Sequence, residues 1–195
     1  MNLARRITHF TEDEYIARER VIETKHEFVN GEIFAMFGAR LRHNLIASST
    51  IASLCGALRN TPCRVFNSDQ RIAITATGAY TYADAGVVCG RPELHPKDDM
   101  ALVNPALLVE VLSKSTASYD RGEKLSHYRR QPSVQEILIV WQSEIRVERH
   151  RRVGDYEWLV TEHAEGEIEL RTLGGSIALA DLYAQVDWSQ PEDTA

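Results

Sequence analysis

A short apolar run with a single acid inside it constrains this chain more than any other feature. Asn104-Pro105 opens the run, which extends from Ala106 to Leu112 and is apolar throughout except for Glu110. Short runs of this kind, rich in branched side chains, are typical of a strand that is covered on both faces. A carboxylate buried there without a partner costs several kcal/mol. Either a structural salt bridge or a divalent cation is therefore expected to neutralise Glu110.

The patterns around this strand predict one α/β domain over residues 1–195, with frayed ends at about 1–9 and 186–195. A capping box at Thr11-Glu-Asp-Glu14 starts a first helix, and Asn30-Gly31 is a strong signal for a hairpin turn. Further helices are expected at 42–58, 119–130 and 177–183, and strands at 64–74, 85–89, 106–112, 135–141, 145–150, 156–160 and 168–171. This order favours a mixed central sheet flanked by helices, with an antiparallel strand extension.

Asp84 repeats the pattern of Glu110 at the head of a second apolar strand, where it serves either as a metal ligand or as a turn cap. If the two strands lie side by side, the carboxylates of Asp84 and Glu110, a backbone carbonyl and waters suit Mg²⁺ (or Mn²⁺), which prefers oxygen ligands. A metal ion held in this way polarises a phosphodiester and lowers the pKa of bound water.

Such chemistry also needs a cation near the developing charge, and Lys124 is the candidate. Asp120 lies four residues earlier, so that it shares a helix face with Lys124. The alternative for this pair is a solvated surface salt bridge. His43 in the helix at 42–58 either faces the site or is an ordinary core or surface histidine.

Composition limits the partners and the location. The net charge is −6, so charge alone does not hold long nucleic acid, which would need a local patch or a metal-loaded acidic site. No apolar run reaches the ~20 residues that span a bilayer, and the N-terminus has no apolar signal core. Cys55, Cys63 and Cys89 show no C-x-x-C spacing and are expected to be reduced and mostly buried. A cytoplasmic protein without a membrane partner is predicted.

The acids and the lysine occur in an order that resembles a known superfamily. Asp84 and the string from Glu110 through Asp120 and Lys124 to Tyr128 resemble the PD-(D/E)xK restriction-endonuclease-like superfamily. Within it, they look like the small stand-alone branch of bacterial proteins labelled restriction endonucleases. The resemblance continues upstream through 26–33, 43–44 and 68–72, and covers about residues 10–185. The single motifs are weak, whereas their order and joint spacing are specific.

This resemblance implies a restriction-endonuclease-like fold and a set of site residues. Asp84 and Glu110 match the two acids of the motif and would both be metal ligands. Glu27 or Glu32 would match an additional N-terminal acid that many members place in the site. Ala83 stands where the motif has proline, a residue that only shapes the backbone there.

A second departure from the motif concerns the lysine. Leu112 occupies the position two residues after the acid, where a catalytic lysine is usual. Residues i and i+2 of a strand face the same side, so Leu112 would present an uncharged side chain beside Glu110. The resemblance suggests that the lysine is relocated to the next helix in this branch, and Lys124 matches that position. We therefore expect the Lys124 ammonium to approach the Glu110 carboxylate.

The implied function is Mg²⁺-dependent hydrolysis of DNA phosphodiester bonds. Asp84, Glu110 and Lys124 would be catalytic, with Glu27, Glu32, Asp120 and His43 supporting them. A homodimer is expected because cleavage of both DNA strands pairs with two-fold symmetry, and the strands over 145–170 offer an edge for it. One alternative is a catalytically inert nucleic-acid-binding or interaction module on the same fold, which Leu112 and the acidic charge would suit. The other is a metal-dependent hydrolase of smaller phosphate esters.

Overall fold

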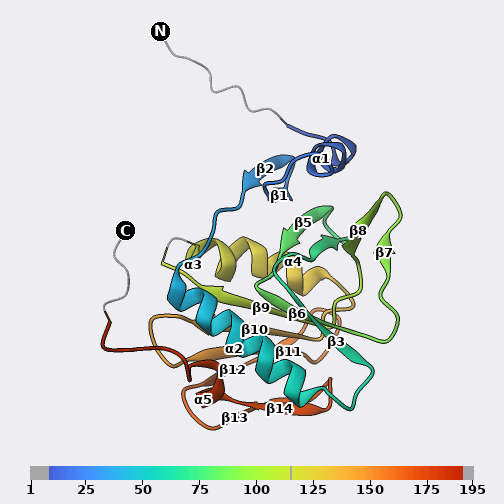
Figure 1. Ribbon diagram of the computed structural model, residues 1–195. Helices are drawn as coiled ribbons and strands as arrows, with labels where there is room; N and C mark the ends of the chain where they lie inside the picture. Colours follow the sequence, from blue (N-terminus) through green and yellow to red (C-terminus); the bar gives the residue numbers. More distant parts are fainter. Residues whose placement is uncertain (1–8, 115, 191–195) are drawn as a thin grey trace.

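The strand that carries Glu110 lies inside a mixed six-stranded sheet, which we call the central sheet (Figure 1). The computed structural model describes residues 9–114 and 116–190. The strand order is β12-β11-β10-β9-β6-β3, in which β9 and β10 are parallel and every other neighbouring pair is antiparallel. The bounds are β3 (Cys63–Asn67), β6 (Ala85–Cys89), β9 (Leu107–Leu112), β10 (Glu136–Trp141), β11 (Val147–Arg152) and β12 (Trp158–His163).

A second six-stranded sheet, the N-terminal sheet, has the order β2-β1-β5-β4-β8-β7. Its strands are β1 (His26–Val29), β2 (Glu32–Ala35), β4 (Arg71–Ile74), β5 (Ala79–Tyr82), β7 (Leu94–His95) and β8 (Asp98–Leu102). A separate hairpin consists of β13 (Glu167–Leu170) and β14 (Gly175–Ala178). The helices are α1 (Glu12–Glu19), α2 (Leu41–Ala57), α3 (Ala117–Tyr119), α4 (Leu125–Arg130) and α5 (Leu179–Leu182).

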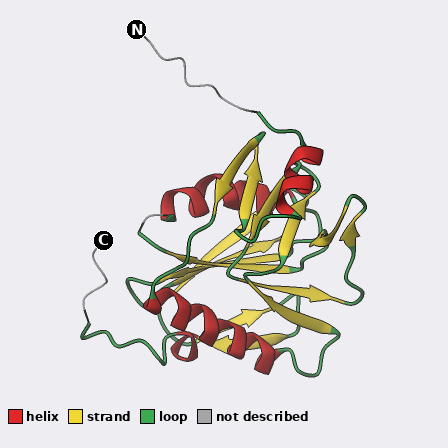
Figure 2. Cartoon of the chain, turned by 45° about the horizontal axis from the view of Figure 1, so that its top comes forward, coloured by secondary structure: helices red, strands yellow, loops and turns green. Residues whose placement is uncertain are grey.

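Helices cover both faces of the central sheet, as Figure 2 shows for α2 on one side and α4 on the other. Alternate side chains of β9 enter two different cores. Val109 packs in the cluster that includes Leu54 of α2, whereas Leu108 packs in the cluster that includes Leu125 of α4. β9 is therefore buried along its whole length, which confirms the prediction of a strand covered on both faces.

The predicted mixed α/β architecture and the local signals are confirmed. Thr11 and Glu14 form the expected capping box at the start of α1. Asn30 and Gly31 both have positive φ, 52° and 83°, as the turn between β1 and β2 requires. The antiparallel extension is present in β11 and β12, whose strands continue the sheet beyond β10.

Three predicted elements differ from the structure. The strand expected at 64–74 is two strands in different sheets, because an Asx turn, in which the Asp69 amide donates to the Asn67 side chain, reverses the chain between them. The strand near 168–171 pairs with β14 and does not extend the central sheet. The helix expected at 177–183 begins only at Leu179, since Gly175–Ala178 is extended.

The helix expected at 119–130 is also more irregular than its polar pattern predicts. It begins at Ala117 and contains a π-helical turn, η1 (Asp120–Lys124), between α3 and α4. The Leu125 amide donates to the carbonyl of Asp120, five residues earlier. Such turns are rare and occur often at functional sites. Both Asp120 and Lys124 lie in this turn.

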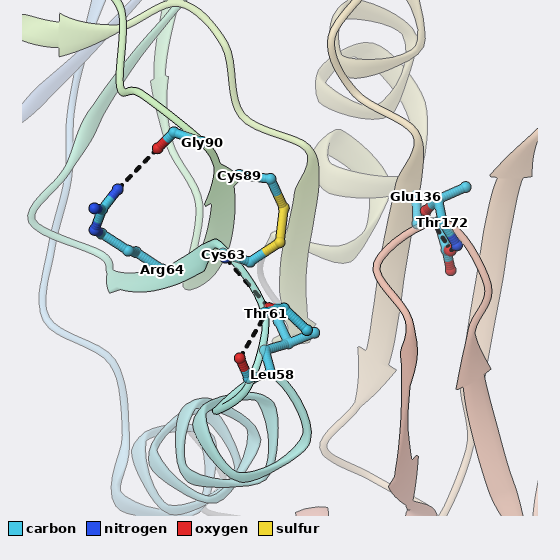
Figure 3. Close-up of a disulfide and its surroundings, with 8 residues drawn as sticks. All are labelled: Leu58, Thr61, Cys63, Arg64, Cys89, Gly90, Glu136 and Thr172. Atoms are coloured by element: carbon cyan, nitrogen blue, oxygen red, sulfur yellow. Dashed lines mark hydrogen bonds between the residues drawn. A yellow bond between two sulfur atoms is a disulfide. The ribbon is translucent and has the colours of Figure 1, made fainter.

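The prediction of reduced, mostly buried cysteines is wrong. Cys63 of β3 and Cys89 of β6 face each other in register and form a disulfide (Figure 3), while Cys55 is exposed. The two paired cysteines are 26 residues apart in sequence, and only the pairing of β3 with β6 brings them together. Cysteine spacing alone carries no signal for such a cross-strand pair.

Two further sequence predictions concern the ends of the chain and the membrane. Most of the ends expected to be frayed, 1–8 and 191–195, lie outside the described residues. Within the part of the chain that the structure describes, no helix is long and apolar enough to cross a membrane.

Candidate active site

The buried acid of β9 is paired with the lysine of the π-helical turn. The Lys124 ammonium lies 3.0 Å from Glu110 Oε1 and donates a hydrogen bond of 3.1 Å to Glu110 Oε2. Tyr128, one turn further along α4, donates a 2.5 Å hydrogen bond to Glu110 Oε1. Glu110 is 3% exposed and Lys124 is 4% exposed. The expected approach of Lys124 to Glu110 is thus present in the structure.

Glu27 of β1 contacts the same ammonium from the N-terminal sheet. Its Oε1 lies 3.0 Å from Lys124 Nζ and accepts a hydrogen bond of 3.2 Å from the Tyr82 amide. Its Oε2 accepts a hydrogen bond of 3.0 Å from the Tyr119 hydroxyl. The Tyr82 carbonyl also accepts from Lys124 Nζ at 2.9 Å. Lys124 therefore joins the N-terminal sheet to the central sheet.

Asp84 lies between β5 and β6 and is held by two groups. Its Oδ2 accepts a hydrogen bond of 2.7 Å from the Val111 amide of β9 and lies 3.2 Å from His43 Nε2 of α2. Its own amide donates to the carbonyl of Val109. Asp84 is thus tied by its backbone and its carboxylate to both sides of Glu110 on β9, which brings the two acids of the motif together.

These residues line one cavity of about 910 Å³, at the upper end of the size range of ligand sites. Of the seven residues that the sequence singles out, six line it: Glu27, His43, Asp84, Glu110, Asp120 and Lys124. The seventh, Glu32, is exposed at the start of β2 and faces Val29 across the hairpin turn. Of the two N-terminal acids considered, the structure brings only Glu27 to the cavity.

The cavity contains more acids than cations. Its carboxyl groups belong to Glu27, Asp84, Glu110, Asp120 and Glu123, and its cationic groups to Arg40, Lys114 and Lys124, in addition to the His43 imidazole. Burial, with the charges of Asp84 and Asp120, raises the pKa of Glu110 well above its ordinary value, although Lys124 opposes this. Burial likewise raises the pKa of Asp120. Keeping these carboxyl groups ionised therefore costs free energy, and a bound cation would lower that cost.

Asp84 and His43 form a pair that favours the charged form of both. Burial would raise the pKa of Asp84, but His43 and Lys124 hold it below its usual value. Burial would lower the pKa of His43, but Asp84 raises it above its ordinary value. Asp84 is therefore an anion in this site even though it is largely enclosed.

The fit of a metal ion can be judged from the donors. Among residues 9–114 and 116–190, no three His, Cys, Asp or Glu side chains converge as a ready metal cage. Mg²⁺ needs fewer protein ligands than that, because it keeps several waters and often takes only one or two carboxylates. Asp84 and Glu110 supply two carboxylates in a cavity with excess negative charge. These residues fit such a site.

Several contacts of this site escape sequence reasoning. Tyr128 and Tyr119 donate to Glu110 and Glu27, and the Tyr82 carbonyl accepts from Lys124. The sequence gives a weak indication for Tyr128, because its spacing of four residues from Lys124 places both side chains on one helix face. The other contacts arise from the N-terminal sheet and have no local signal.

Leu112 shares the face of Glu110, as the strand spacing predicts. It is 4% exposed and packs in the cluster that contains Leu125 and Ile139, where it is covered by α4. The position two residues after Glu110, where a lysine is usual, is therefore part of the hydrophobic core in this chain.

Fold and site together define a protein of the restriction-endonuclease-like class. The structure is similar to the crystal structure of "a putative nuclease belonging to DUF820" from Anabaena variabilis ATCC 29413, with a TM-score of 0.72 and 17% sequence identity over 90% of this chain and 98% of that chain. At this level of identity the similarity shows the fold. The chain belongs to the Uma2 family, described as "Putative restriction endonuclease", which matches residues 13–181.

Two relatives from Synechocystis sp. (strain ATCC 27184 / PCC 6803 / Kazusa) resemble most of the chain. One, "Uncharacterized protein sll1609", is 37% identical over 152 residues, which are 78% of this chain and 86% of that protein. The other, "Uncharacterized protein slr1290", is 33% identical over 172 residues, or 88% and 90% of the two chains. The superfamily and the fold inferred from the order of the acids are thereby confirmed, and the family is one described as nucleases. The roles of individual residues stay predictions.

Proposed function

We propose that this protein is a metal-dependent DNA endonuclease that hydrolyses phosphodiester bonds, with its catalytic centre at Asp84, Glu110 and Lys124. The observation that supports it best is the buried contact of 3.0 Å between Lys124 and Glu110 in the cavity that Asp84 also lines. This contact places a cation beside the two acids although Leu112 occupies the usual lysine position. The proposed activity is that of a single domain over residues 1–195.

Each residue of the candidate site has a distinct role in this proposal. Mg²⁺ or Mn²⁺, held by Asp84 and Glu110, would polarise the phosphodiester and lower the pKa of bound water. Lys124 orients the attacking water or balances the charge that develops on the phosphate. Glu27 and Asp120 keep the ammonium in place, since they lie 3.0 Å and 4.0 Å from it. His43 fixes the orientation of the Asp84 carboxylate.

The same proposal includes a cytoplasmic homodimer that acts on DNA. DNA is the substrate that the family description favours, and the net charge of −6 implies that the metal and local cations carry the binding. Disulfides such as that of Cys63 and Cys89 are uncommon in the cytoplasm, and neither residue lines the cavity. We therefore expect activity whether or not the disulfide is present.

The test is cleavage, with Mg²⁺ or Mn²⁺, of plasmid DNA and of a single-stranded oligonucleotide by four variants. We expect Glu110→Ala and Lys124→Met to lower the cleavage rate by about 100-fold or more, as loss of a charge at a transition state typically does. Glu27→Gln should also lower the rate, whereas Glu32→Gln, an exposed acid of the same hairpin, should not. Circular dichroism checks that every variant is folded.

Three results would contradict the proposal. Cleavage that persists in Glu110→Ala would indicate a contaminating nuclease. No cleavage by the unmodified protein, together with no Mg²⁺ or Mn²⁺ binding in calorimetry, would favour an inert module on the same fold. Turnover of small phosphodiesters without cleavage of DNA would favour a hydrolase of smaller esters.

A further inference from the structure

One wall of the cavity is apolar and aromatic, unlike its acidic floor. Phe34 of β2, and Met36 and Phe37 of the segment that follows it, line the same cavity as Glu110 and Lys124. Phe37 is 89% exposed and Phe34 is 47% exposed. Single exposed apolar side chains are common, but two exposed aromatic rings at one cavity indicate a binding surface for a ligand or a partner.

The hairpin fixes this wall close to the acids. Phe34 is the cross-strand partner of Glu27, so the two side chains leave the same face of the hairpin about 5 Å apart at their Cβ atoms. The Met36 amide donates a 2.9 Å hydrogen bond to the carbonyl of Lys25, which anchors the chain just before Phe37. In Figure 1, this segment runs from β2 past α3 to the start of α2. Phe34 therefore borders the cavity directly beside Glu27, and Phe37 lines the same cavity three residues later.

Two cations line the same cavity as the aromatic wall. Arg40 precedes α2 and Lys114 follows β9, and both line the cavity and are exposed. Among the described residues, neither side chain has a hydrogen bond or an ion pair within the protein. Unpaired cations and exposed rings in one cavity are complementary to a ligand that carries both flat apolar groups and negative charges. A nucleic-acid strand has this composition, with bases to stack and phosphates on either side.

We propose that Phe34 and Phe37 are a stacking platform for unpaired bases, so that the substrate is single-stranded DNA or DNA with an unpaired branch. Here the term stacking platform means these two rings, with Arg40 and Lys114 as phosphate contacts. Within a duplex both faces of each base are covered by its neighbours, so a base stacks on a side chain only where the strand is unpaired or distorted. This inference rests on the proposed nuclease function and specifies its substrate.

The experiment measures binding separately from cleavage. The full chain is titrated into a single-stranded oligonucleotide that carries 2-aminopurine, and into its duplex, with Ca²⁺ as an oxygen-ligated divalent cation. We expect the single strand to bind more tightly and its fluorescence to be quenched by stacking. The variant with both Phe34→Ala and Phe37→Ala should raise Kd for the single strand by about tenfold or more. Phe37→Trp, which keeps an aromatic ring, should bind like the unmodified chain.

Tyr156→Ala is the matched control, because Tyr156 is 94% exposed but lies outside this cavity. It should leave Kd unchanged. Equal binding of duplex and single strand, or an unchanged Kd in the double alanine variant, would overturn the stacking platform. A shift of that variant from dimer to monomer in sedimentation would overturn it as well, because the rings would then be a contact between two copies. Quenched, phenylalanine-dependent binding without any cleavage would support the platform and contradict the nuclease proposal alone.

Discussion

The ammonium group of Lys124 contacts both six-stranded sheets of this protein. Burial alone would lower the pKa of Lys124, but Glu110, Glu27 and Asp120 raise it well above its ordinary value. The lysine is thus a permanent cation at neutral pH. A charge of this kind can balance negative charge on a phosphate, but the group is not deprotonated at neutral pH. This favours an electrostatic or orienting role for Lys124 over a role as general base.

A residue-scale prediction concerns Gly86 of β6. A methyl group there would lie 2.2 Å from Cζ of Phe66, whose ring covers Gly86 from the neighbouring strand β3. Gly86→Ala must displace this ring, so we expect the free energy of unfolding in urea to fall by about 1–3 kcal/mol. Gly56→Ala in α2 is the control. A methyl group at Gly56 meets no atom within 4 Å, and alanine should raise helix stability by about 0.5–1 kcal/mol. Equal effects of the two substitutions would contradict this explanation.

The sequence predicts part of the site. A residue is predictable where burying it without a partner would cost free energy in any fold. Glu110 is predictable because a carboxylate inside an apolar strand needs a partner whatever the fold. The choice of Glu27 over Glu32 is not predictable, since both leave the same face of one short hairpin and only the contacts of Glu27 with other elements distinguish it. The hydrogen bond from Tyr119 to Glu27 likewise depends on how the helical segment packs against the N-terminal sheet. No local sequence pattern predicts that packing.

At the scale of elements, the π-helical turn η1 places two site residues and then leads into α4. α4 also packs on β11, where Arg129 and Glu148 hold His150 between them. The Arg129 guanidinium can only donate, so it requires His150 Nδ1 to accept and leaves the ring proton on Nε2, which donates to Glu148. This arrangement selects the neutral imidazole. It is an electrostatic contact between α4 and the antiparallel extension.

The neutral state of His150 gives a pH prediction. Burial, with the charge of Arg129, lowers the pKa of His150 below its ordinary value, although Glu148 opposes this. The unfolded chain takes up a proton near pH 6.5 and the folded chain does not, so acid favours unfolding. The contribution of His150 to the free energy of unfolding should therefore fall below about pH 6.5, by at most about 1.4 kcal/mol per pH unit.

Urea titrations of the unmodified chain and of His150→Gln measure this contribution, since glutamine can accept from Arg129 and donate to Glu148 without titrating. The advantage of the unmodified chain over the variant should shrink between about pH 7.5 and 5.5. His127, whose pKa burial also lowers, is present in both proteins and cancels in the difference. Parallel curves for the two proteins would contradict the prediction.

Element boundaries were predictable where the local signal and the packing agree. The capping box of α1 and the Asn30-Gly31 turn are decided by the residues themselves. The division of 64–74 into β3 and β4 depends on the two sheets to which these strands belong, which is a long-range property. The π-helical turn is not predictable either, since the residues Asp120–Lys124 carry no local signal for it. The same turn contains Lys124, which lies between Glu27 and Glu110.

At the scale of the whole molecule, the central sheet ends in β12, which carries exposed apolar side chains. Leu159 and Val160 are 43% and 45% exposed, and β12 has a neighbour in the sheet on one side only. An open strand edge of this kind can pair with another chain. β12 lies within the 145–170 segment from which a homodimer contact was predicted. The proposed dimer would therefore continue the central sheet from one copy to the next.

Sedimentation velocity tests this contact. We expect a dimer for the unmodified chain and a monomer for Leu159→Lys, because charges on an edge strand oppose pairing. Val21→Lys, at a site that is 82% exposed just after α1, should leave the dimer intact. A monomeric unmodified chain would refute the homodimer. A dimer that survives Leu159→Lys would place the contact at another surface.

Glu110 and Lys124 lie on two separate elements, the central strand β9 and the π-helical turn η1 packed over it. During evolution the two groups can therefore be lost independently. A deletion of one residue before Lys124 would turn its side chain away by about 100° of helix rotation, although every functional residue would still be present in the sequence. Some relatives with a complete set of site residues should accordingly be inactive, and the length of the segment between β9 and α4 will distinguish them better than residue identity.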